Sequence, residues 1–202
     1  MLTFNKINVS VNGIDLVKDF SLTIFHGACV IIKGKNGSGK TTLLKSLSGI
    51  VALGSGKIFY NENDIINHIK EYNSLICHIG HGNALNLELT VLENLEYWAT
   101  LNNRIDTITA ASIVFDLQEL FHTKVGNLSK GWQRKVALTR LLLTNAEIWF
   151  LDEPYTNLDQ ASCTILDNLI FSKCSQNGIV IVASHIKENI FNSINVCMED
   201  FK

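Results

Sequence analysis

Hydrophobic and polar residues alternate over the first 25 positions of the chain, in two runs separated by Asn12-Gly13. The first run ends at Val11 and the second begins at Ile14. Alternation is typical of strands with one buried face, and Asn-Gly between such runs favours a tight hairpin because both turn residues adopt positive φ. The pattern therefore predicts that residues 2–25 form two antiparallel strands.

Short, solidly apolar runs follow, and they alternate with segments of helical period. Such runs are typical of strands that are buried on both faces of a parallel sheet. Strands of this kind are predicted at 29–32, 148–151 and 179–183. Further short strands are predicted at 56–60 and 75–79, and helices at 41–47 and 160–173. This alternation of strands and helices predicts an α/β fold with a parallel sheet and N-terminal antiparallel strands.

One long segment breaks the alternation. Between about residues 90 and 145 the hydrophobic period is mainly helical, with Thr90 and Ser129 as candidate N-caps. We expect a helical subdomain over about residues 85–145, inside a single domain that spans residues 1–202.

The composition excludes some functions. The chain has 202 residues, 47% of them hydrophobic, and a formal net charge of −2. These values fit one domain with a sizeable core and argue against a nucleic-acid partner bound through bulk positive charge. No apolar run reaches the roughly 18–20 residues that span a bilayer, and the first residues lack the features of a secretion signal. The five cysteines form no C-x-x-C pair, so we expect a reducing, cytoplasmic compartment.

A glycine-rich segment stands between the predicted strand at 29–32 and the predicted helix at 41–47. It satisfies the pattern G-x-x-x-x-G-K-[ST], whose glycines turn backbone N–H groups around a phosphate at a helix N-terminus. Lys40 is then expected to reach the β- and γ-phosphates of ATP, and Thr41 to ligate Mg²⁺. The segment predicts a P-loop NTPase core with the binding residues Gly34, Lys35, Asn36, Gly37, Ser38, Gly39, Lys40, Thr41 and Thr42.

A second motif follows the predicted strand at 148–151, where Asp152 and Glu153 are adjacent acids. Carboxylates at the end of a buried strand are costly unless they meet cations or water. A Mg²⁺ held by Thr41 and phosphate oxygens supplies such a partner. We therefore expect Asp152 to act on the metal, as a Walker-B carboxylate, and Glu153 to orient and deprotonate the attacking water.

A third motif, at residues 128–133, indicates which class of P-loop NTPase this is. Its sequence is Leu-Ser-Lys-Gly-Trp-Gln, and it opens a predicted helix whose N-terminus, at Ser129, can grip a γ-phosphate. The motif resembles the LSGGQ signature of ATP-binding cassette (ABC) ATPases. Ser129 and Gly131 match the signature, whereas Trp132 stands where glutamine is usual. The resemblance spans about residues 2–198 and implies a homodimer in which the signature of one subunit serves the ATP held by the other.

The resemblance also assigns further residues to the site. Asp159 matches the D-loop aspartate that reaches across the dimer, and His185 matches the switch histidine that contacts the γ-phosphate. Two positions depart from the family pattern. His81 stands where the Q-loop glutamine is expected, and Val11 and Asn12 lie where an aromatic residue stacks on adenine.

Four local sequences favour one branch of this family. Residues 78–81, 89–95, 131–141 and 148–159 resemble the ATP-binding subunits of bacterial cytochrome c maturation, or haem export, complexes. This resemblance implies an ABC-type ATPase, a translocase, bound peripherally to the cytoplasmic face of the inner membrane. It implies integral-membrane partners of the CcmB and CcmC type, driven by ATP-dependent dimerisation.

The same motifs leave other functions open. The chain could be the ATPase subunit of another small-cargo ABC exporter, a soluble ABC ATPase, a P-loop small-molecule kinase or a regulatory cassette that does not hydrolyse ATP. Soluble members of the family usually carry two cassettes or a long coiled-coil insertion, for which this chain has no room. A kinase would leave the signature helix and His185 without a role. A metal site at His78 and His81 is disfavoured because no third ligand is evident.

Overall fold

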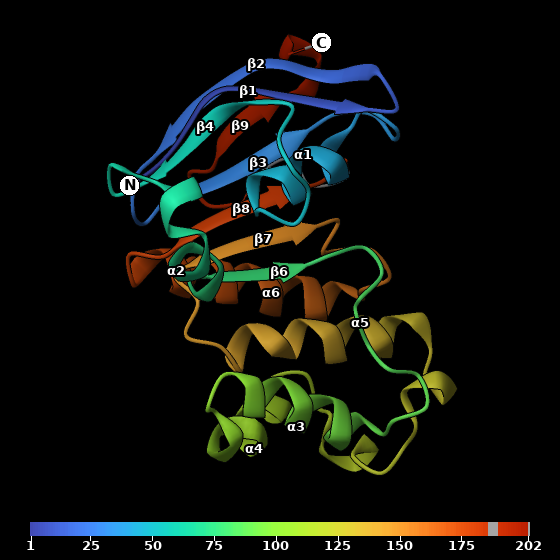
Figure 1. Cartoon of the computed structure of the whole chain (residues 1–202). Helices are drawn as coiled ribbons and strands as arrows, with labels where there is room; N and C mark the ends of the chain where they lie inside the picture. The colour runs from blue at the N-terminus through green and yellow to red at the C-terminus, as the bar shows by residue number, and fades with distance from the viewer. Residues whose placement is uncertain (186–189, 202) are drawn as a thin grey trace. The chain divides into compact units, whose positions relative to one another are not determined.

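The computed structural model describes residues 1–185 and 190–201 (Figure 1). The strands are β1 (Leu2–Val11), β2 (Ile14–Ile24), β3 (Cys29–Lys33), β4 (Ser55–Tyr60), β5 (Asn63–Asp64), β6 (Ile76–Ile79), β7 (Ile148–Asp152), β8 (Ile179–Ala183) and β9 (Ile194–Cys197). The α-helices are α1 (Lys40–Leu47), α2 (Ile69–Ser74), α3 (Val91–Leu101), α4 (Ile108–Ile113), α5 (Lys130–Thr139) and α6 (Gln160–Ser175). Short 3₁₀ helices are η1 (Ile65–His68), η2 (Ile105–Thr107), η3 (Gln118–Leu120), η4 (Val125–Asn127), η5 (Arg140–Leu142) and η6 (Met198–Phe201).

The chain divides into two compact units. The first unit comprises residues 1–78, 146–153 and 170–202, and the second comprises residues 79–145 and 154–169. Over the parts of the chain that the structure describes, no helix combines the length and the apolar character needed to cross a membrane.

The predicted N-terminal hairpin is confirmed. β1 and β2 pair antiparallel across Asn12 and Gly13, whose φ angles of 52° and 78° match the left-handed turn that Asn-Gly favours. The four-stranded sheet has the order β2-β1-β4-β5. Its apolar face is buried, with Phe4 and Phe20 among the largest side chains in the core of the first unit.

The predicted parallel sheet is also confirmed, with the strand order β6-β7-β8-β3-β9. All residues of β7 and β8 are buried, as their continuous apolar sequences indicate. Ala183 of β8 lies opposite both Ile32 of β3 and Asp152 of β7. The carboxyl ends of these three strands therefore lie at one edge of the sheet, where open α/β sheets bind ligands.

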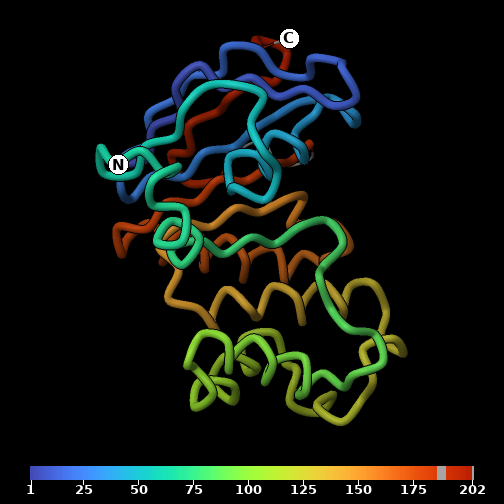
Figure 2. Tube along the Cα trace, in the orientation of Figure 1, coloured from blue at the N-terminus to red at the C-terminus, as the bar shows by residue number. Residues whose placement is uncertain are grey.

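Several short elements, among them β9 and α2, have no counterpart in the sequence patterns. The edge strand β9 pairs parallel with β3, but most of its residues are exposed, so it lacks the apolar run of a buried strand. The short helix α2 buries only Tyr72 and so lacks a helical period. The 3₁₀ helix after β9 brings Phe201 against Phe20, with ring centroids 4.9 Å apart. Figure 2 shows the C-terminal segment next to the N-terminal hairpin.

The second unit is helical. Thr90 caps α3 with a capping box, because its hydroxyl accepts from the Glu93 N–H while the Glu93 carboxylate accepts from the Thr90 N–H. Ser129 caps α5 by accepting from the Trp132 N–H at 3.3 Å. Both predicted N-caps are thus confirmed, and α5 begins immediately after Ser129.

Candidate functional site

The glycine-rich loop connects β3 to α1 and is shaped by its glycines. Gly37 and Gly39 have φ angles of 78° and 97°, in the left-handed region that other residues avoid. Gly39 is the N-cap residue of α1 and accepts from the Leu43 N–H at 2.8 Å. The loop therefore curls back over the first turn of α1, where the helix N-terminus favours an anion.

The interior of this loop has the shape and chemistry of a phosphate cradle. Ser38 is 7% exposed, and its hydroxyl has no hydrogen-bond partner among the residues that the structure describes. A Cβ atom on Gly34 would lie 2.6 Å from that hydroxyl oxygen. A buried hydroxyl without a partner is costly, and a phosphate oxygen would satisfy it.

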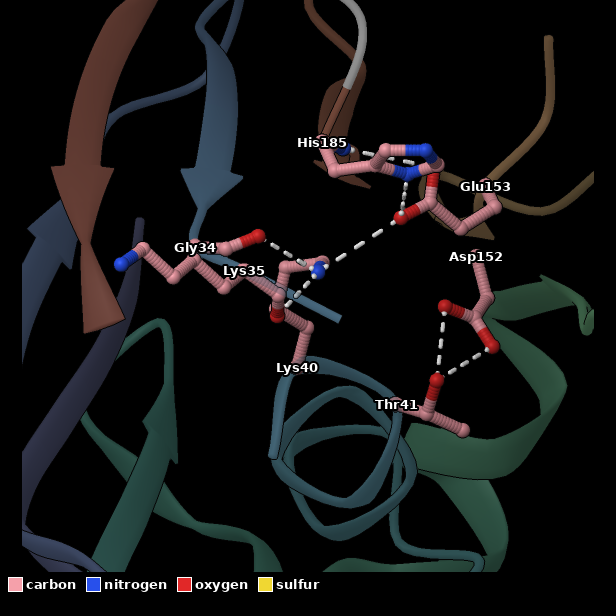
Figure 3. Close-up of polar contacts among 7 residues, drawn as sticks. All are labelled: Gly34, Lys35, Lys40, Thr41, Asp152, Glu153 and His185. Carbon is pink, nitrogen blue, oxygen red and sulfur yellow. Dashed lines mark hydrogen bonds and ion pairs between the residues drawn. The ribbon is translucent and has the colours of Figure 1, made fainter. Parts of the chain in front are cut away.

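Lys40 points into the same cradle (Figure 3). Its ammonium donates to the carbonyl oxygens of Gly34 and Lys35 at 2.8 and 3.1 Å, and it lies 3.6 Å from Oε1 of Glu153. The side chain is almost fully buried, which is tolerable only because these oxygens surround the charge. Lys40 thus supplies a cation beside the loop's backbone amides.

Thr41 and Asp152 form an oxygen-donor pair. The Thr41 hydroxyl contacts both carboxylate oxygens of Asp152, at 3.1 and 2.9 Å. Asp152 is 1% exposed and ends β7. Hydroxyl and carboxylate oxygens are ligands that Mg²⁺ prefers, so this pair suits the metal role predicted for both residues.

Glu153 and His185 meet beside Lys40. Nδ1 of His185 lies 2.8 Å from Oε1 of Glu153, and the His185 N–H donates to Oε2 at 3.4 Å. The Glu153 backbone has φ 45°, a left-handed conformation that costs a non-glycine residue about 1–3 kcal/mol. The bond from its N–H to the Ala183 carbonyl oxygen, 2.8 Å long, helps to hold that conformation. Strain of this kind is typical of functional residues.

The signature residues lie in the second unit, together with the D-loop. A Cβ atom on Gly131 would lie 2.8 Å from the carbonyl oxygen of Asn157, so only glycine allows this approach. Gln133, which follows Trp132, is buried and donates to the carbonyl oxygens of Val125 and Leu128, so its side-chain amide is engaged inside the second unit. Trp132 lies beneath Lys135, whose ammonium is 4.4 Å from the ring centroid.

Asp159 also lies in the second unit and is bonded to α5. Its carboxylate accepts from the Ser162 N–H at 2.7 Å and from the Lys135 ammonium at 2.9 Å. The Ser162 N–H and then the Lys135 ammonium hold the pKa of the Asp159 carboxyl well below its ordinary value. Asp159 is thus bonded to the helix that carries the signature residues, through Lys135 of α5.

The two positions that depart from the family pattern are both accessible. His81 is exposed, in the segment between β6 and α3. Val11, at the end of β1, is 40% exposed. Across residues 1–185 and 190–201, no group of three or more His, Cys, Asp or Glu side chains could hold a metal ion.

Sequence patterns missed several residues around the loop. Leu16 and Met198 would both lie within 3.6 Å of a Cβ atom on Gly39, and Met198 also packs against Gly34. These residues come from β2 and η6, far from the loop in sequence, and no local motif marks them.

The comparisons agree with this geometry. The ABC transporter family model matches residues 17–156. The cytochrome c biogenesis ATP-binding export protein CcmA of Wolbachia pipientis wMel is 42% identical, covering 92% of this chain and 89% of the relative. The protein of the same name from Rickettsia bellii is 39% identical, covering 94% of this chain and 95% of the relative.

A solved structure gives the same result for the fold. The putative ABC transporter ATP-binding protein from Pyrococcus furiosus superposes with a TM-score of 0.84 at 28% identity, covering 100% of this chain and 98% of the other. The α/β fold with a parallel sheet, an antiparallel sheet and helices is that of ABC ATPase domains. The chain therefore belongs to the ABC transporter family, as an ATP-binding protein close to the CcmA proteins of cytochrome c biogenesis.

Proposed function

We propose that this chain hydrolyses ATP to drive the membrane subunits of a haem-export complex that serves cytochrome c maturation. The main observation behind the proposal is the position of the Glu153 carboxylate. It lies between Lys40 and His185 and beside the Thr41–Asp152 pair. The haem-export assignment rests on the names and identities of the relatives.

The phosphates of ATP suit the loop between β3 and α1. Lys40, the Ser38 hydroxyl and the N–H groups of residues 34–42 supply positive charge and donors in one concave segment. Thr41 and Asp152 would hold Mg²⁺, which neutralises phosphate charge when bound. Asn36, Gly37 and Thr42 complete the proposed binding segment.

Glu153 is the proposed general base. Its carboxylate orients a water molecule, whose oxygen forms a bond to the γ-phosphorus while the bond from that phosphorus to the β,γ-bridging oxygen breaks. The water proton passes to Glu153. His185 holds the carboxylate through its Nδ1 contact and leaves its other ring nitrogen for the γ-phosphate.

Ser129, Gly131 and Asp159 are the residues proposed to form the contacts of a homodimer. ATP-binding subunits of this family dimerise and work with membrane subunits. Ser129 caps α5 and Gly131 lies in its first turn, where backbone N–H groups have no acceptor within the helix and are of the kind that bind anions. In the proposed homodimer they contact the γ-phosphate held by the partner copy, and Asp159 approaches the same interface. Hydrolysis removes that link, so the dimer opens.

The proposed partners and location follow from the relatives. Integral-membrane subunits of the CcmB and CcmC type would supply the translocation path, with this chain bound peripherally at the cytoplasmic face of the bacterial inner membrane. His81 lies in the segment that corresponds to the Q-loop, which we propose senses the nucleotide state.

The proposal is tested by expressing the tagged full chain beside candidate membrane subunits. We expect ATP hydrolysis without any added acceptor, and co-purification of an integral-membrane partner. Phosphoryl transfer that requires a small-molecule acceptor would indicate a kinase instead. ATPase activity with no membrane partner in membrane fractions or pull-downs would indicate an ABC ATPase without a transport role.

A further inference from the structure

Two arginines in the second unit are buried, Arg134 on α5 and Arg140 in η5. Arg134 is 3% exposed and Arg140 is 7% exposed. A buried guanidinium is stable only when several acceptors surround it. The acceptors of these side chains therefore show which parts of the chain they hold in place.

Arg134 connects two segments that flank proposed site residues. Its Nη1 donates to the Gly80 carbonyl oxygen at 2.9 Å and to Oδ1 of Asn83 at 2.6 Å, and its Nε donates to the Pro154 carbonyl oxygen at 3.2 Å. Gly80 and Asn83 flank His81 in sequence, and Pro154 directly follows Glu153. One side chain of the signature helix thus ties the turn that carries His81 to the carbonyl group of Pro154, the residue after Glu153.

The Arg140 side chain also binds this turn, at a backbone oxygen. Its Nη1 donates to the Asn83 carbonyl oxygen at 3.1 Å, and its guanidinium lies 3.6 Å from the centroid of the Trp98 ring. Asn83 and Ala84 have φ angles of 59° and 51°, which are unfavourable for a residue with a Cβ atom. The hydrogen bonds from the two arginines therefore add to the turn's own bonds, from the Asn83 N–H to the Gly80 carbonyl oxygen and from the Ala84 N–H to the Gly82 carbonyl oxygen.

We propose that Arg134 is a positioning residue for ATP hydrolysis, which fixes the turn at 80–83 and the Pro154 peptide so that His81 and Glu153 stay in place during turnover. The proposal rests on the proposed function, in which Glu153 is the base. Arg134 does not need to touch ATP. Only a guanidinium can serve these acceptors, because its planar fork presents donors in fixed, diverging directions, whereas an ammonium is a single point charge.

The first test uses Arg134→Lys in the full chain, in the preparation in which the wild type hydrolyses ATP. We expect kcat to fall about 10- to 100-fold, as for a misplaced catalytic group. The Kd for ATP should stay within about twofold of the wild-type value, because the phosphate loop is untouched. Equal loss of affinity and turnover, or an unchanged kcat, would overturn the proposal.

A second variant separates positioning from simple destabilisation. Asn83→Asp combined with Arg134→Lys pairs an ammonium with a carboxylate, which restores a tie between α5 and the turn. Recovery of at least about half of the lost activity, on the logarithmic scale of a double-mutant cycle, supports the proposal. A double variant that folds but stays as slow as Arg134→Lys overturns it.

The matched control is Lys124→Ala, which removes an exposed cation of the same unit whose partner is the exposed Glu88. We expect its kcat to equal that of the wild type, since exposed ion pairs contribute little. ATP binding and turnover, measured together, also distinguish failure of the proposed function from failure of the role of Arg134. A wild type that binds no ATP contradicts the proposed function, whereas an active wild type beside an equally active Arg134→Lys variant contradicts only the role of Arg134.

Discussion

Oε1 of Glu153 lies 2.8 Å from Nδ1 of His185, and this contact joins the end of β7 to the segment that follows β8. The same oxygen lies 3.6 Å from the ammonium of Lys40. Figure 3 shows the three side chains converging on one point beside the Thr41–Asp152 pair. A carboxylate held in this way has a defined orientation, which a general base requires.

Replacement of this carboxylate should separate binding from hydrolysis. Glu153→Gln keeps the size of the side chain but removes the charge that accepts the water proton. We expect kcat to fall at least about 100-fold, while ATP binding persists and a dimer accumulates with ATP. Steady-state ATPase assays and light scattering with and without ATP measure both effects. A wild-type rate in this variant would refute the role of Glu153 as base, and Glu71→Gln, on the surface of α2, is the control.

Removal of the Lys40 ammonium should weaken the binding of ATP. Lys40→Ala deletes the ammonium that lies among the Gly34, Lys35 and Glu153 oxygens. Charge-assisted hydrogen bonds to phosphate contribute about 1.5–3 kcal/mol, so we expect ATP affinity to fall at least about tenfold. Titration of a fluorescent ATP analogue measures this change. The control is Lys18→Ala, whose side chain is 56% exposed. Undiminished affinity and turnover in Lys40→Ala would contradict the assignment of the phosphate loop.

The glycine of the signature should be irreplaceable for a steric reason. The added methyl group of Gly131→Ala would lie 2.8 Å from the Asn157 carbonyl oxygen, so the backbone of α5 or of the D-loop must shift. We expect a loss of about 1–3 kcal/mol in the free energy of unfolding, as for other overpacked sites, and a lower ATPase rate. Urea denaturation gives the free energy. Gly82→Ala should change it by about 1 kcal/mol or less, because nothing lies within 4 Å of the added atom. Similar values for the two variants would show that the approach to Asn157 is not restrictive.

Asp159 should make stability depend on pH in the acid range. The Ser162 N–H and the Lys135 ammonium lower its pKa in the folded protein, so its contribution is present above the unfolded pKa of about 3.9. That contribution is lost as the pH falls through the depressed folded pKa. We therefore expect wild type to be more stable than Asp159→Asn at pH 6, and the difference to shrink progressively below about pH 4.

Asparagine suits this comparison because it caps a helix about as well as aspartate does. Asp159 directly precedes α6 and accepts from the Ser162 N–H, so Asp159→Asn removes the charge but keeps a side-chain acceptor at this position. Chemical denaturation at a series of pH values gives the difference in free energy. A difference that is constant between pH 6 and pH 3 would show that the Ser162 N–H and the Lys135 ammonium do not lower the pKa of Asp159 in the folded protein.

Much of the site could be predicted because its signals are local. The glycines at 37 and 39, Lys40 and Thr41 are adjacent in sequence, and their backbone geometry is set by residue type. Asp152 and Glu153 follow a run of apolar residues that can only be a buried strand here. Thr90 and Ser129 are N-caps whose side chains bond to N–H groups three residues away, so short windows of sequence contain the whole interaction.

Other features depend on residues that are far apart in sequence. Leu16 and Met198 pack around the loop glycines, and Arg134 binds Gly80, Asn83 and Pro154. Nothing in the neighbourhood of these residues marks them, since buried arginines have no sequence signature of their own. The exposed edge strand β9 was missed for the same reason, because its pairing with β3 is long-range and its residues carry no apolar run.

The sequence by itself determined the class of the protein, the order of its motifs and the residues of the proposed phosphate site, because periodicity, turn chemistry and motif spacing act over short distances. Only the tertiary structure decided that Glu153 adopts a strained backbone beside His185 and Lys40, that Gln133 is turned inward, and that Arg134 ties two loops together. These features arise from the pairing of strands and the burial of charges, which bring together atoms that the linear sequence keeps apart.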